Sequence, residues 1–160
     1  MPSLTMTRRN LPIDSSRGFT LIELLVVVVV TAILLALAAP SFRQIIQNQR
    51  IRAASSDLYA SLALARSEAI KRNTNITLSP VGGSWANGWQ VSHPSVAGAF
   101  LEQHSSLQGI SIVTTATNVR FLSSGRVDTG AATFTISGAG ASSQRCVSID
   151  LGGRPSVKTC

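Results

Sequence analysis

The chain has 160 residues and a net charge of +7, and it is 44% hydrophobic with only 13% charged residues. This composition excludes intrinsic disorder, and the length favours one domain, or one domain with an appendage. A simple soluble globule is also excluded, because the apolar excess is concentrated between Phe19 and Ala39.

The segment 19–39 is predicted to be a membrane-spanning helix. Its 21 residues would span about 31 Å, which matches the hydrocarbon core of a bilayer. Arg8, Arg9 and Arg17 precede it, and basic residues favour the cytoplasmic side. The sequence therefore predicts that residues 1–18 are cytoplasmic and that the rest of the chain lies across the membrane.

Glu23 is a carboxylate inside this apolar segment. At the centre of a bilayer such a group costs about 2.5 kcal/mol or more. One interpretation is a residue that favours the helix dipole and reaches the interface. An isolated carboxylate in hydrocarbon is costly, whereas a carboxylate paired with a cation is much less so.

Residues 40–72 are predicted to continue the helix as an amphipathic half. The helix is expected to end at about Arg72, before Asn73. Pro40 removes a backbone donor and predicts a kink or local unwinding. The basic residues beside the apolar stripe fit a solvated face or contact with lipid headgroups. The stripe has helical spacing and consists of Ile51, Ala54, Leu58, Leu62, Ala65 and Ala69.

Residues 73–160 show alternating patterns separated by Gly-rich turns, which indicate short strands. The predicted fold class is therefore α+β, with a mainly antiparallel β-sheet head packed on the amphipathic half-helix. Residues 92–108 are expected to form an irregular connection. The predicted strands centre on Ile76–Leu78, Trp89–Val91, Ile110–Ile112, Val119–Phe121, Phe134–Ile136 and Val147–Leu151.

Cys146 and Cys160 are the two cysteines of the chain. Both fall on the predicted far side of the membrane, where an oxidising compartment favours a disulfide. The alternative is a pair of free thiols. A bridge would close a short loop and stabilise the head by roughly 3 kcal/mol.

No residue pattern predicts catalysis. His93 and His104 are interpreted as exposed loop histidines, and neither has a spaced partner that indicates a metal site. No nucleotide-binding or nucleophile motif occurs. We therefore expect no enzyme activity, no cofactor and no metal.

The stretch "GFTLIELLVVVVVTAILLALAAPSF" resembles the class III signal of type IV pilins and type II secretion pseudopilins. The resemblance implies that a prepilin peptidase cuts after Gly18 and methylates the new amino group of Phe19. Glu23 would then be the fifth mature residue, able to approach the amine of a neighbouring subunit in a filament. It would act in assembly and register.

The later motifs "ALARSEAIKRN", "FLSSGRV" and "GGRPSVKTC" resemble the GspH/FimT branch of these proteins, which includes FimU-like minor pilins. The resemblance implies a pilin fold and a subunit that starts or caps a type IV pilus or type II secretion pseudopilus. Implied partners are other pilins or pseudopilins and an inner-membrane assembly platform. The implied location is the inner membrane, single-pass, with a periplasmic head.

An alternative function is DNA binding during natural transformation. Some members of the branch carry a Gly-Arg-x-Arg element near the C-terminus. Gly153 and Arg154 match its first half, whereas Ser156 replaces the second arginine. Lys158 could substitute two positions later, and Arg145 adds a third cation that can contact phosphates.

Overall fold

The computed structural model describes residues 18–160, except for the side chains of residues 38–40. The predicted leader, residues 1–18, therefore lies outside the described residues apart from Gly18. The chain divides into two compact units, Met1–Ala38 and Ala39–Cys160, and each is considered by itself.

One long helix, α1 (Leu21–Arg72), begins in the first unit and ends in the second. It starts after Thr20, whose hydroxyl accepts a hydrogen bond from the Glu23 backbone N–H at 3.3 Å. It stops where Asn73 adopts a left-handed backbone with φ 49°. Asparagine tolerates that conformation at a helix end, so the predicted end at Arg72 is confirmed. The helix includes Pro40, and a kink there remains a prediction.

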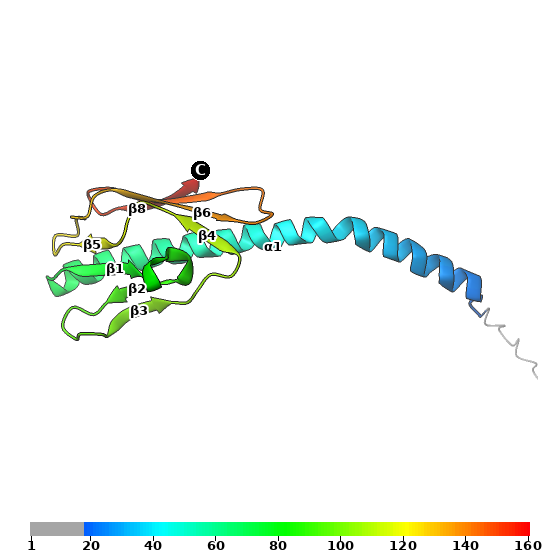
Figure 1. The fold of residues 1–160 in the computed structure, drawn as a ribbon, viewed down its shortest axis with the longest axis horizontal. Helices are drawn as coiled ribbons and strands as arrows, with labels where there is room; N and C mark the ends of the chain where they lie inside the picture. Colours follow the sequence, from blue (N-terminus) through cyan, green and yellow to red (C-terminus); the bar gives the residue numbers. More distant parts are fainter. Residues whose placement is uncertain (1–17) are drawn as a thin grey trace, which may run out of the picture. The chain divides into compact units, whose positions relative to one another are not determined.

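The second unit contains residues 39–72 of α1, which we call its head half. Two four-stranded antiparallel sheets and two short 3-10 helices lie along this half (Figure 1). Sheet A has the order β3-β2-β1-β5, and sheet B has the order β4-β6-β7-β8. The short helices are η1 (Val81–Gly83) and η2 (Trp85–Asn87). The strands are β1 (Ile76–Pro80), β2 (Trp89–Ser92), β3 (Phe100–His104), β4 (Ile110–Val113), β5 (Val119–Phe121), β6 (Ala132–Gly138), β7 (Arg145–Ile149) and β8 (Pro155–Thr159).

The register of each sheet follows from the alternation of apolar side chains. In sheet B, Phe134 lies opposite Val147. The next pair on the same face is Ala132 opposite Ile149. All four side chains are buried. A slip of one residue would turn this set toward solvent, so burial fixes the pairing.

Two strands were not predicted. β3 lies within 92–108, which were expected to be irregular, yet it pairs with β2 along its length. The prediction failed because β3 is an edge strand whose Phe100 is 42% exposed, so it lacks a clear alternation. β8 is also an edge strand, mostly exposed, and it begins with a proline. Leu151, expected at the end of a strand, lies in the turn before β8 and is exposed.

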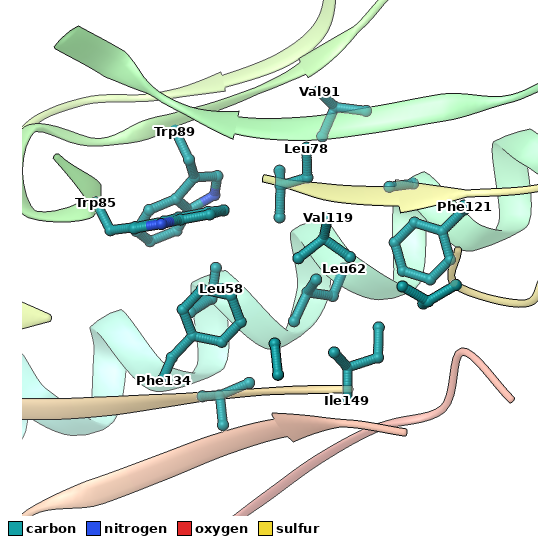
Figure 2. Packing of buried hydrophobic residues seen from close by; sticks show 14 of the residues in the cluster. Leu58, Leu62, Leu78, Trp85, Trp89, Val91, Val119, Phe121, Phe134 and Ile149 are labelled. Carbon is teal, nitrogen blue, oxygen red and sulfur yellow. The ribbon is translucent and has the colours of Figure 1, made fainter. Parts of the chain in front are cut away.

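The core forms where α1 meets both sheets. The predicted helical stripe from Ile51 to Ala69 is at most 1% exposed. Trp85 packs edge-on against Phe134, with ring centroids 4.8 Å apart. Figure 2 shows Leu58 and Leu62 from the helix among side chains of both sheets. The predicted packing of a mainly antiparallel head on the amphipathic half-helix is thus confirmed, with two sheets in place of one.

We expect Leu62→Ala to lower the free energy of unfolding by about 2–5 kcal/mol, because it removes buried methyl groups and leaves a cavity. The measurement is urea unfolding of the full chain in detergent, followed by fluorescence of the buried Trp89. Ile46→Ala is the matched control, since Ile46 is 49% exposed on the same helix. Equal losses for both variants would contradict the assigned core.

Candidate functional site

The first turn of α1 holds the predicted assembly residue. Thr20 and Glu23 are spaced as a capping box, in which the threonine occupies the N-cap and the glutamate the third helical position. The Thr20 hydroxyl satisfies the Glu23 backbone N–H. Among the described residues the Glu23 carboxylate has no hydrogen bond or ion pair. The T-x-x-E spacing is the sequence signal for this cap.

The helix around Glu23 presents apolar side chains in every direction. All large apolar residues from Phe19 to Leu37 are 49–82% exposed. By length and composition α1 could cross a membrane. A helix that is apolar all round requires lipid or other apolar helices as surroundings.

The family-like motifs of the head meet at one place, which we call the distal junction: Arg66, Gly125 and the turn 150–154. The Arg66 guanidinium donates from Nε to the Gly125 carbonyl at 3.2 Å and from a terminal nitrogen to the Gly152 carbonyl at 3.3 Å. The Val127 N–H donates to the Leu151 carbonyl. One helix residue therefore holds loops from both sheets.

Gly153 is required at this junction by two features. Its φ is 76°, in the left-handed region that favours glycine. A Cβ atom there would lie 2.0 Å from the Gly125 carbonyl oxygen, which belongs to the backbone and cannot rotate away. The "GGRP" motif therefore has a structural role in this chain.

Two arginines of the second unit pair with carboxylates. Arg72 donates to Glu68, and this hydrogen bond is the main cause that lowers the pKa of the Glu68 carboxyl. Arg120 likewise binds Asp128 and lowers the pKa of that carboxyl. The arginine side chains are 39% and 51% exposed and the carboxylates 15% and 22%, so solvent reaches both pairs and screens their attraction.

The structure does not bring Arg145, Arg154 and Lys158 together. Arg154 lies in the turn before β8, where its backbone N–H donates to Asp150. Lys158 lies opposite Cys146 in the β7–β8 register, so it shares the face of Cys146. Arg145 precedes Cys146 in β7 and therefore faces the other side of the sheet.

The predicted Cys146–Cys160 disulfide is present, with the two Cα atoms 5.2 Å apart. It joins β7 to the residue that follows β8. The disulfide therefore holds the C-terminal end of β8 to β7, and the turn 150–154 connects the two strands at the other end.

His104 is not an exposed loop histidine. It lies in β3, half-buried, with its ring stacked on Trp89 at a centroid distance of 4.3 Å. Its Nε2 is 3.1 Å from a carboxylate oxygen of Asp57 on α1. Together with a hydrogen bond from Trp89 Nε1 to buried Ser61, this contact ties sheet A to the helix.

His93 follows β2, and its Nδ1 accepts hydrogen bonds from the backbone N–H groups of Ser95 and Val96. Within the described part of the chain, no group of three or more His, Cys, Asp or Glu side chains could hold a metal ion.

Comparison with known families gives two matches. Residues 54–153 match the model of the type II transport protein GspH, which covers more than half of the chain. Residues 13–39 match the prokaryotic N-terminal methylation motif. A search of curated proteins found no match.

Two kinds of solved structure share the fold. The type IV minor pilin FimU of Pseudomonas aeruginosa aligns with a TM-score of 0.58 and 22% identity, over 69% of this chain and 90% of that chain. The minor pseudopilin EpsH from the type 2 secretion system of Vibrio cholerae aligns with a TM-score of 0.56 and 16% identity, over 69% and 97%. These identities establish similarity of fold.

We expect Gly153→Ala to destabilise the head more than Gly130→Ala. Both glycines have positive φ, so alanine at either position costs roughly 1–2 kcal/mol of backbone strain. Only the Gly153 variant adds a collision, because nothing lies within 4 Å of a Cβ at Gly130. Urea unfolding of the full chain measures both. Equal destabilisation would show that the distal junction is loose.

Proposed function

Because this chain belongs to the GspH family of type II transport proteins, we propose that it is inserted in the inner membrane and helps to initiate or cap a filament. The chain is a minor pilin or pseudopilin of the type IV pilus or type II secretion kind. The filament is accordingly a type IV pilus or a type II secretion pseudopilus. The role is structural.

The observation that carries this proposal is the apolar surface of α1 with a single carboxylate at its start. Phe19 to Leu37 expose their large apolar side chains, and burying a leucine or valine is worth about 1.5–3 kcal/mol. A bilayer buries this surface before assembly, and neighbouring helices bury it afterwards. The same segment can therefore serve as an anchor and as a filament core.

Glu23 supplies the register in this proposal. Cleavage after Gly18 would make Phe19 the first residue and leave a cationic amine one residue before the Thr20 cap. The Glu23 carboxylate, whose own backbone N–H is already satisfied by Thr20, remains available to that amine in an adjacent subunit. In an apolar environment a paired charge is much less costly than an isolated one.

The segments have separate tasks in the proposal. Residues 1–18 are a cytoplasmic leader removed by prepilin peptidase, and residues 19–39 span the membrane. Residues 40–72 carry the periplasmic head formed by residues 73–160. An inner-membrane assembly platform and other pilins or pseudopilins are the partners. The separation of Arg145, Arg154 and Lys158 gives the DNA-binding alternative no support, and it is not part of the proposal.

Glu23→Ala is expected to leave membrane insertion intact and to reduce incorporation into filaments at least about tenfold, because it leaves a buried amine unpaired. The measurement is the amount of the subunit in sheared filaments relative to the membrane fraction. Glu23→Gln keeps the shape and removes the charge, so it should fail equally. Glu23→Asp keeps the charge and should restore part of the incorporation. Normal incorporation of Glu23→Gln would contradict the charge pairing.

The mature chain is expected to start at Phe19 with a methylated amino group. Mass spectrometry of the N-terminal peptide from membranes measures this directly. Gly18→Trp should block cleavage and leave residues 1–18 attached. A wild-type chain that starts after Ala39 would contradict both anchoring and assembly.

A further inference from the structure

The chain contains one basic stretch that the proposed function does not use. We call residues 42–52 the arginine segment. Arg43, Arg50 and Arg52 are exposed in this segment, which belongs to the second unit of the chain. No acidic residue occurs between Glu23 and Asp57. The segment therefore carries three cations with no neighbouring carboxylate in sequence to offset them.

The same segment exposes an apolar stripe. Phe42, Ile45 and Ile46 have the i, i+3, i+4 spacing of one helix face, and they are 63%, 54% and 49% exposed. The first core residue of the head is Ile51, so this stripe precedes the packed part of the helix. A shallow hollow beside Arg52 is lined by Ile45, Asn48 and Gln49. Exposed apolar side chains beside arginines are typical of helices at membrane surfaces.

We propose that the arginine segment binds anionic phospholipid headgroups on the head side of the membrane. This inference rests on the proposed membrane insertion of residues 19–39. If Ala39 marks the edge of the hydrocarbon core, Arg43 follows by about 6 Å along the helix, within the headgroup layer. Arg50 and Arg52 follow by roughly 17–20 Å, about one Debye length beyond that layer. The attraction should therefore be strongest at Arg43 and salt-dependent at Arg50 and Arg52.

The charge of the segment selects this partner. A second copy of the chain lying in register would place the same three arginines opposite one another, which is repulsive at close range. An anionic bilayer surface has the opposite sign. Each arginine near that surface raises the affinity for the membrane roughly fivefold. By the same placement Phe42 lies beside Arg43 in the headgroup layer, about 4–5 Å beyond Ala39 along the helix.

The test uses the full mature chain in nanodiscs of neutral lipid, or of neutral lipid with one third phosphatidylglycerol. Hydrogen exchange of peptides covering the arginine segment is measured by mass spectrometry. We expect at least a threefold slower exchange in the anionic discs, lost at high ionic strength. Arg43→Gln, Arg50→Gln and Arg52→Gln combined should abolish the difference, and Arg43→Gln alone should remove the largest share.

The matched control combines Lys71→Gln, Arg126→Gln and Arg154→Gln, which removes the same charge from exposed residues outside the arginine segment. It should keep the effect of anionic lipid. Equal exchange in both disc types, or slowing that survives the arginine substitutions, would overturn the proposal. Protection by added duplex DNA in neutral discs, without an effect of anionic lipid, would overturn it in favour of nucleic acid. Co-purification of the chain with neutral discs measures membrane insertion separately from headgroup binding. A chain that does not co-purify would contradict the proposed function, whereas a chain that co-purifies without slower exchange in anionic discs would contradict only this inference.

Discussion

The head depends on burial of one stripe of α1. Its large members, Ile51, Leu58 and Leu62, lie in one buried cluster with side chains of both sheets, and its alanines at 54, 65 and 69 are buried in the same cluster. All six are at most 1% exposed. Removing a methyl group from any of them would leave a cavity in the core and lower the stability of the head. The inner faces of both sheets belong to the same buried cluster as this stripe. The helix is therefore a shared core element of the two sheets.

The contacts around this stripe are held by few polar groups. Arg66 binds the carbonyls of Gly125 and Gly152, and Asp57 and Ser61 bind side chains of sheet A. The motifs that resemble the GspH family thus largely mark where loops must reach the helix. The short motif "GGRP" is explained by a backbone approach too close for any side chain. Such motifs indicate the fold better than they indicate a ligand.

The long helix and its buried stripe were predictable, because a period of 3.6 residues persists over many turns. Six strands were also found where alternation is clear. β3 and β8 were missed, since edge strands bury few side chains and their pattern weakens. The partnership of His104 with Asp57 was beyond the sequence, because residues 47 positions apart show no local signal. The Cys146–Cys160 pair was predictable from compartment and count, whereas the separation of the C-terminal cations needed the strand register.

The buried stripe of α1 packs in one apolar cluster with residues that all come later in the chain, from Ile76 to Ile149. Synthesis from the N-terminus produces this stripe first and the strands that cover it last. Until β7 is synthesised, Ile51, Leu58 and Leu62 remain exposed to water, and contacts between residues far apart in sequence make folding slow. The order of synthesis therefore creates an interval in which the stripe of the emerging chain has no covering strands and can bind other apolar surfaces.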